Sequence, residues 1–199
     1  MNDIPVIMLA AGQSRRMGGT DKLMKEVDGV PLVRRSTEIA MTAGPVIVAL
    51  PPRPHPRFDI LADLEMLRVP IADAAEGMNA SLRGALRHVT TQAPAVLVML
   101  ADLPELTAVD LATVIGARKA QPDYLIWRGA TDKGKPGHPV LFDRSLFTQL
   151  GKLQGDEGAQ SVVQAHKDKV HLVSLPGQHA LRDLDTEEDW DAWQANRTL

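Results

Sequence analysis

The chain has 199 residues, a formal net charge of −3 and no cysteine, and 24% of its residues are charged. This length fits one α/β domain over residues 1–199 with a full hydrophobic core. The slightly negative charge argues against a nucleic-acid-binding protein, because such proteins usually carry a basic face. Without cysteine the chain has no disulfides, no thiolate catalysis and no cysteine-bound metal, so any metal must be held by oxygen or histidine.

The sequence also gives an expectation about location. The N-terminal segment lacks the basic region and the long apolar stretch of a secretory signal peptide. No run approaches the roughly 18 apolar residues that a membrane helix needs. We therefore expect a cytoplasmic protein that binds neither membrane nor nucleic acid.

Short apolar runs recur along the chain between helical patterns. Several of these runs are too continuous for strands buried on one face, which alternate apolar and polar residues. Strands covered on both faces have this pattern, so the sequence predicts a largely parallel sheet between two layers of helices. The predicted strands are residues 4–9, 45–50, 95–100, 123–127, 138–142 and 170–175.

Helices are expected between these strands. Apolar residues recur every three or four positions over residues 32–43 and 82–89. Two further helix starts are marked by capping-box pairs, which are Thr107 with Asp110 and Thr186 with Asp189. Residues 51–56 hold four prolines and predict a surface loop, and residues 129–137 predict another.

Residues 9–22 follow the first predicted strand and read Leu-Ala-Ala-Gly-Gln-Ser-Arg-Arg-Met-Gly-Gly-Thr-Asp-Lys. Free backbone N–H groups in a small-residue turn form an anion-binding hollow, and Gly12 lets a ligand approach closely. Three cations follow, which are Arg15, Arg16 and Lys22. The turn therefore predicts phosphate binding, although its spacing is neither that of a Walker P-loop nor that of a dinucleotide fold. An ordinary glycine-rich turn with solvated arginines is the structural alternative.

One carboxylate, Asp102, stands where the third predicted strand ends. The carboxyl edge of an open α/β sheet is where ligands bind. A charge directly after six apolar residues is costly unless it is paired, and Mg²⁺ is a fitting partner. Capping of the following turn, at Pro104, is the structural alternative.

Further polar segments fit either a site or ordinary structure. Asn79 and Ser81 are placed to cap the helix of residues 82–89, whose free N–H groups also suit an anion. His138 stands between two prolines beside Gly137, and a lone histidine is more often structural than catalytic. Carboxylates in the C-terminal third, as isolated features, indicate helix starts and solvated turns.

Six short motifs in this order resemble those of the MobA-like nucleotidyltransferases, and among them the molybdenum cofactor cytidylyltransferases. They are LAAGQSRRMGG with Lys22, EGMNASLR, ADLP at 101–104, PGHP at 136–139, GDEGAQ at 155–160 and DLDTEEDW at 183–190. The resemblance spans nearly the whole chain. It implies an α/β, Rossmann-like three-layer αβα sandwich with a mostly parallel sheet, of the nucleotide-diphospho-sugar transferase type. It also implies Mg²⁺-dependent transfer of a nucleoside monophosphate to a phosphorylated acceptor, with release of pyrophosphate.

The resemblance assigns roles by position. Catalysis falls to Arg16, Lys22 and Asp102, of which the first two would contact the triphosphate. Mg²⁺ would be held by Asp102, with Asp156 as a second contact and Asp185 as a weaker one. The nucleotide would be bound by Leu9, Ala10, Ala11, Gly12, Arg16, Lys22 and Ser81. The acceptor, molybdopterin, would be bound by Gly137 and His138.

The expected nucleotide is CTP. Guanine-using relatives typically have Leu-Ala-Gly-Gly where this chain has Leu9-Ala10-Ala11-Gly12, and the methyl group of Ala11 favours the smaller pyrimidine. The spacing Arg-Met-Gly-Gly-Thr-Asp-Lys is common in guanylyl enzymes and argues for GTP. The alternatives are therefore a GTP-dependent guanylyltransferase of the molybdenum cofactor or another small-phosphate nucleotidyltransferase. From another class comes a non-catalytic chaperone that delivers the cofactor to a client molybdenum oxidoreductase.

Overall fold

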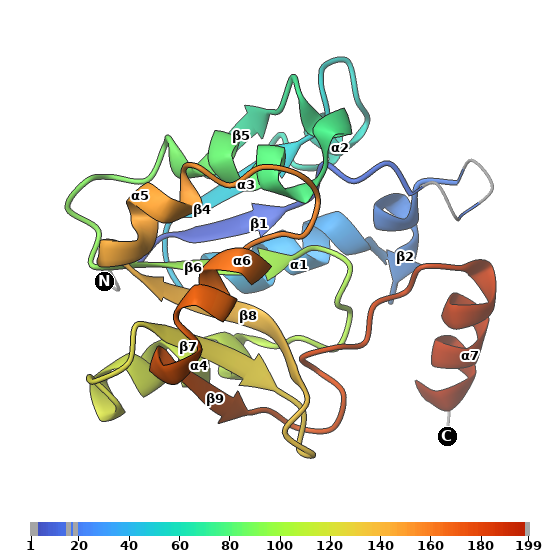
Figure 1. The fold of residues 1–199 in the computed structure, drawn as a ribbon. Coiled ribbons are helices and arrows are strands. Elements are labelled where there is room, and N and C mark those ends of the chain that lie inside the picture. The colour runs from blue at the N-terminus through green and yellow to red at the C-terminus, as the bar shows by residue number, and fades with distance from the viewer. Residues whose placement is uncertain (1–3, 15–16, 18–19, 198–199) are drawn as a thin grey trace.

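The computed structural model describes residues 4–14, 17 and 20–197. These residues form one seven-stranded sheet with helices on both of its faces (Figure 1). The strand order across the sheet is β5-β4-β1-β6-β8-β7-β9. Its strands are β1 (Val6–Leu9), β4 (Val46–Leu50), β5 (Leu67–Pro70), β6 (Ala95–Leu100), β7 (Ile126–Ala130), β8 (Pro136–Asp143) and β9 (Val170–Ser174). A small hairpin pairs β2 (Glu26–Val27) with β3 (Val30–Pro31).

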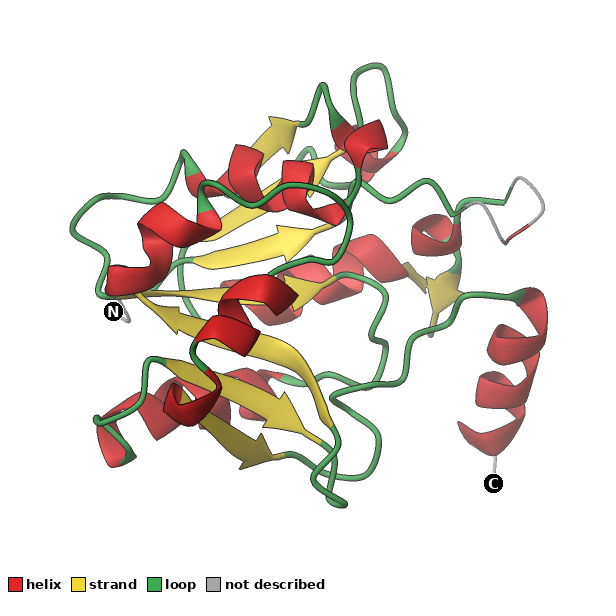
Figure 2. Ribbon diagram, in the orientation of Figure 1, coloured by secondary structure: helices red, strands yellow, loops and turns green. Residues whose placement is uncertain are grey.

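The sheet is mostly parallel, with β8 as the exception. β5, β4, β1 and β6 pair in parallel, and so do β7 and β9. β8 runs antiparallel to both of its neighbours, β6 and β7. The helices, red in Figure 2, join these strands. They are α1 (Leu32–Met41), α2 (Arg57–Ile60), α3 (Met78–Leu86), α4 (Ala108–Ala120), α5 (Phe147–Leu150), α6 (Gln160–Ala165) and α7 (Glu187–Arg197), with 3₁₀ turns η2 (Lys22–Met24), η3 (Ala74–Glu76), η4 (Arg144–Leu146) and η5 (Lys167–Lys169).

Alternate side chains of the strands feed two separate cores. Val6 and Met8 of β1 belong to the core that α1 and α4 cover. Ile7 and Leu9 belong to the core beneath α3, α5 and α6. Successive side chains of a strand point to opposite faces, so burial of both faces requires an apolar residue at every position. The continuous apolar runs of the sequence therefore predicted the three-layer sandwich correctly.

The two capping boxes expected from the sequence are present in the structure, whereas one strand of the sheet was not predicted. The capping box at Thr107 and Asp110 is present in both directions and begins α4. Thr186 and Asp189 likewise exchange hydrogen bonds ahead of α7. The edge strand β5 was not predicted, because its four residues, Leu-Arg-Val-Pro, include an arginine and a proline and are too few for an alternating pattern to be read. Among the described residues, no helix has the length and apolar character needed to cross a membrane.

Candidate functional site

A cavity of about 400 Å³ opens at the carboxyl ends of β1 and β6. Leu9 pairs with Leu100 in the parallel register, so the residues that follow the two strands emerge side by side. The amide of Ala101 donates to the carbonyl of Leu9 (3.2 Å), and Ser36 of α1 donates to the carbonyl of Ala101 (2.9 Å). From β1 the chain turns to β4 on one side, while β6 lies on the other. Such a reversal of strand order is where open α/β sheets bind ligands.

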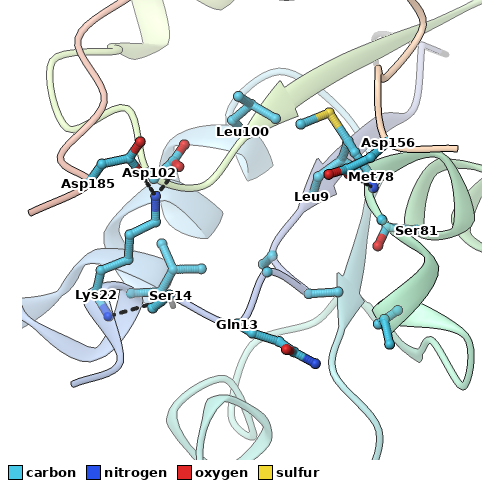
Figure 3. A pocket seen from close by; sticks show the side chains of 17 residues that line it. Leu9, Gln13, Ser14, Lys22, Met78, Ser81, Leu100, Asp102, Asp156 and Asp185 are labelled. Carbon is cyan, nitrogen blue, oxygen red and sulfur yellow. Dashed lines mark hydrogen bonds and ion pairs between the residues drawn. The ribbon is translucent and has the colours of Figure 1, made fainter. Parts of the chain in front are cut away.

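Lys22 lies between two carboxylates at this cavity (Figure 3). Its Nζ donates to Oδ2 of Asp102 (2.6 Å) and to Oδ1 of Asp185 (2.5 Å). Burial by itself lowers the pKa of Lys22, but the charges and hydrogen bonds of the two carboxylates outweigh burial and raise it. The ammonium group is therefore charged and already paired before a ligand enters.

The C-terminal segment brings Asp185 to the cavity. Lys25, beside η2, pairs with Glu187 of α7, and its ammonium also lies 5.0 Å from the centre of the Trp190 ring. Trp190 is fully buried. α7 is thereby fixed against the segment that carries Lys22. Burial and the charges of Asp185 and Asp102 raise the pKa of Asp183, so the carboxylates around Lys22 affect one another.

Asp102 also has an unused oxygen. Its Oδ1 is buried and has no hydrogen-bond partner among the described residues. A buried carboxylate oxygen without a donor is costly. Hard divalent cations take oxygen ligands, so the carboxylates of Asp102 and Asp185 are suited to hold a Mg²⁺ or Mn²⁺ ion. Within the described part of the chain, no group of three or more acidic or histidine side chains is placed to hold a metal, so phosphate oxygens or water would complete the coordination.

A buried arginine holds the helix turn η2, which begins with Lys22. Arg57 is 1% exposed and donates from Nε and Nη2 to both oxygens of Asp21 (2.8 and 2.5 Å). Its Nη1 donates to the carbonyl of Ala10 (2.5 Å). Asp21 in turn accepts from the amide of Leu23 and caps η2. A forked pair of this kind fixes geometry as well as charge. Arg57 therefore ties the end of β1 to the helix turn that begins with Lys22.

The predicted nucleotide-binding residues lie along this cavity as far as they are described. Leu9, Ala10, Ala11, Gly12 and Ser81 all line it together with Lys22. Gly12 is exposed, and a side chain added there would meet open space, so the glycine is not required by packing. Arg16 lies outside the described residues. Asn79 and Ser81 do not cap α3, because that helix begins at Met78 and both residues are inside it.

Asp156 lies across the cavity from Asp102 (Figure 3). Its Oδ1 accepts from the amide of Met78, the first residue of α3 (2.6 Å). Gly77 stands directly beneath it, and a Cβ there would come within 2.4 Å of the same oxygen. Asp156 thus supplies the missing cap of α3. Of the two carboxylates assigned as further metal contacts, Asp185 is the one that lies beside Asp102.

A second, smaller cavity of about 220 Å³ shares Leu9, Met78 and Asp156 with the first. His138 lines it, and its Nδ1 is buried without a hydrogen-bond partner among the described residues. Burial, and next the charge of Arg128, lower the pKa of His138 to about 4, so the imidazole is neutral at physiological pH.

Gly137 does not line either cavity. A Cβ at Gly137 would lie 2.0 Å from the carbonyl oxygen of Ala180, and the next amide, of His138, donates to that same oxygen (2.8 Å). Its small size lets β8 approach the loop before α7. Gly137 therefore helps to position His138, because it allows the amide of His138 to reach the carbonyl of Ala180.

Sequence reasoning did not single out two charged residues of this region, Arg57 and Arg128, and it placed Asp185 after Asp156 as a metal contact. Arg57 follows a proline-rich loop and Arg128 directly follows the strand predicted over residues 123–127, and neither stands in a motif. Asp185 was ranked below Asp156, because nothing in the sequence shows which of the two returns to Asp102. The signal for Asp185 was its place in the DLDTEEDW motif.

Comparison with known proteins agrees with this geometry. A family model described as the MobA-like NTP transferase domain matches residues 6–170. A probable molybdenum cofactor guanylyltransferase from Nostoc sp. (strain PCC 7120) is 30% identical over 193 residues, which cover 95% of this chain and 89% of the relative. This chain therefore belongs to the MobA-like NTP transferase family and is a nucleotidyltransferase.

Solved structures agree on the fold. A homologue of Mycobacterium tuberculosis Rv0371c, from Mycobacterium sp. strain JC1, has 27% identity and a TM-score of 0.83, covering 99% of this chain and 98% of that one. Rv0371c from Mycobacterium tuberculosis H37Rv, in a complex with manganese, has 26% identity and a TM-score of 0.78, covering 95% and 96%. The resemblance drawn from the six motifs is confirmed for both family and fold.

Proposed function

We propose that this chain transfers a nucleoside monophosphate, GMP from GTP, to the phosphate of a molybdopterin-type acceptor and releases pyrophosphate. The observation that carries the proposal is the convergence of Lys22, Asp102 and Asp185 at the carboxyl ends of β1 and β6. The family membership and the name of the Nostoc relative support the acceptor and the nucleotide.

The chemistry is an in-line displacement. An oxygen of the acceptor phosphate attacks the α-phosphorus of the nucleotide, and the bond from that phosphorus to the oxygen bridging the α- and β-phosphates breaks. The electron pair leaves with pyrophosphate. The reaction needs no protein nucleophile, and it needs no general base because the acceptor phosphate is already ionised. It needs positive charge where negative charge develops.

Lys22 and the two carboxylates meet this requirement. An entering triphosphate gives the ammonium group of Lys22 a more highly charged partner than either carboxylate, so we expect it to turn to the phosphates. Asp102 and Asp185 would then hold a divalent cation, which when bound neutralises charge on the phosphate oxygens. The unpartnered Oδ1 of Asp102 supports this assignment, as does the manganese complex of Rv0371c.

The acceptor belongs in the smaller cavity, on the side of His138. That cavity adjoins the first and has mostly apolar walls, which suits a planar heterocycle. The neutral imidazole of His138 is suited to hydrogen bonding with a neutral ring rather than to charge pairing.

CTP is the second candidate nucleotide. Ala11 lines the first cavity and is 3% exposed, so its methyl group reduces the room next to the base. This observation favours a pyrimidine, whereas the Nostoc relative favours GTP. One methyl group changes binding by only about 1–3 kcal/mol, and we therefore give more weight to the relative.

Pyrophosphate release tests the proposal. The protein is mixed with Mg²⁺, with each nucleoside triphosphate in turn, and with molybdopterin or another phosphorylated acceptor, and pyrophosphate is measured. Release that needs both GTP and molybdopterin is expected. Pyrophosphate release with CTP but not with GTP would favour the second nucleotide. Release only with a different phosphorylated acceptor would overturn the molybdopterin assignment. Binding of the nucleotide and the acceptor without any release of pyrophosphate would favour a cofactor-delivery chaperone.

A further inference from the structure

Arg128, in β7, lines the smaller cavity without an anionic partner (Figure 1 locates β7). Its Nε donates to the carbonyl oxygen of Gly137 (2.9 Å), and the guanidinium makes no other hydrogen bond within the described part of the chain. No carboxylate of that part of the chain lies within 4.0 Å of its guanidinium. Arg128 is partly buried, and burial lowers its pKa, as expected for a cation that has lost water without gaining an anion.

The walls around Arg128 do not compensate its charge. The inner wall is apolar and consists of Leu82, Val98, Val140, Phe142 and Val163. His138 is neutral. Two carboxylates, Asp156 and Glu157, line the same cavity, but both belong to exposed residues, and Asp156 is already used to cap α3. A guanidinium does not lose its proton in a protein, so its remaining N–H groups are left to water or to an acceptor that enters the cavity.

The position of the guanidinium is fixed in advance. Nε is bound to the Gly137 carbonyl, and Gly137 is itself pressed against the backbone of Ala180. One donor is thus used for positioning, and the forked face of the guanidinium is left for a ligand. This forked arrangement matches the oxygens of a phosphate or carboxylate.

The smaller cavity is too small to enclose a complete ligand. Its volume of about 220 Å³ is below the roughly 300–1,000 Å³ of complete small-molecule pockets, and it adjoins the 400 Å³ cavity, with which it shares Leu9 and Met78. It is therefore one compartment of a larger site, and its occupant continues into the first cavity.

We propose that Arg128 binds the phosphate of the acceptor and holds it at the border between the two cavities. This assignment rests on the proposed function, in which the acceptor is phosphorylated and attacks a nucleotide in the first cavity. Arg128 is then the residue that makes the enzyme require a phosphorylated acceptor, and His138, though adjacent, contributes no charge to that requirement.

Binding of inorganic phosphate tests the anion site without turnover. Phosphate affinity is measured by calorimetry for the wild type, Arg128→Gln and Arg87→Gln, where Arg87 is an exposed arginine at the end of α3 and gives the same change in net charge. Loss of a charge-assisted hydrogen bond predicts about ten- to hundredfold weaker binding in Arg128→Gln and no change in Arg87→Gln. Equal affinity in the wild type and Arg128→Gln would overturn the proposal.

Lys22→Gln is measured in the same way, because phosphate can also enter the first cavity. Because the two sites are separate, each single variant is expected to weaken one phosphate site and leave the other unchanged, and the double variant is expected to weaken both. Arg128→Lys restores the charge but not the fork, and an intermediate affinity is expected. If Arg128→Gln fails to fold by circular dichroism, Arg128→Lys alone decides, and wild-type phosphate affinity there would count against the assignment.

Kinetics separate this proposal from the proposed function. In Arg128→Gln, the KM for the acceptor is expected to rise about ten- to hundredfold, while the KM for the nucleotide stays within about twofold. An unchanged acceptor KM in an active enzyme overturns the role of Arg128 and leaves the proposed function standing. A wild type that binds phosphate through Arg128 but releases no pyrophosphate with any acceptor overturns the proposed function instead.

Discussion

The two cavities share a wall but hold their charges in opposite ways. In the larger one, at the ends of parallel strands, Lys22 is paired with two carboxylates. In the smaller one, beside the antiparallel strand β8, Arg128 has no anionic partner and His138 is neutral. The cation of the first cavity has anionic partners before a ligand enters, and the cation of the second does not.

This difference indicates different events on binding. A triphosphate with its metal can exchange partners with an existing ion pair, so the charges of the first cavity are kept in place while the site is empty. An unpaired guanidinium in an apolar cavity gains its partner only when the ligand arrives. The arrangement of the first cavity suits the transfer reaction, and that of the second suits recognition of an anionic ligand.

The largest expected effect comes from removing the frame of the first cavity. Arg57→Gln leaves Asp21 and the Ala10 carbonyl without their donor, and we expect the free energy of unfolding to fall by about 3 kcal/mol, measured in urea. The control is Arg34→Gln, which breaks a forked pair on the surface, in which Nη1 and Nη2 of Arg34 donate to the two oxygens of Asp63. Equal effects of the two variants would show that burial of Arg57 has no special weight.

Next in size is the loss of Asp102. Asp102→Ala removes the carboxylate with the unpartnered oxygen, and we expect pyrophosphate release to slow by at least about two orders of magnitude. Asp156→Asn should cost far less, because Asp156 caps a helix on the other side of the cavity. A folded Asp102→Ala enzyme with near wild-type turnover would contradict the metal-ligand assignment.

The neutral histidine of the second cavity predicts a pH dependence. The pKa of His138 is about 4 when folded and near 6.5 when unfolded, so the unfolded chain binds more protons between these values. Stability is fully present above about pH 6.5 and is lost as the pH falls toward 4. Between pH 7 and pH 5 the loss due to His138 is about 2 kcal/mol. Urea unfolding at both pH values should show this loss in the wild type and not in His138→Gln.

The smallest effect concerns the choice of base in the first cavity. Ala11→Gly removes one methyl group and should raise the ratio of kcat/KM for GTP over that for CTP by about tenfold. The ratio is measured at saturating acceptor. An unchanged ratio would show that the base does not lie against Ala11, whichever nucleotide the wild type prefers.

The sequence by itself determined the fold and one side of the site. Apolar residues at every position of the strands require cover on both faces, and this pattern predicts the sandwich without any knowledge of contacts. The sequence also indicated that the turn after β1 and Asp102 after β6 lie at one site. Parallel neighbours end at one edge of the sheet, so residues that directly follow them come together.

Tertiary structure alone decided which distant side chains complete the site. Lys22 and Asp185 are 163 residues apart, and Asp21 and Arg57 are 36 apart. Asp156 and Asp185 look alike in the sequence, yet the first turns to the amide of Met78 and the second to Lys22. Local propensity and periodicity report only neighbours along the chain. The partner of a charged side chain is set by how loops return across the sheet, and that depends on the packing of the whole molecule.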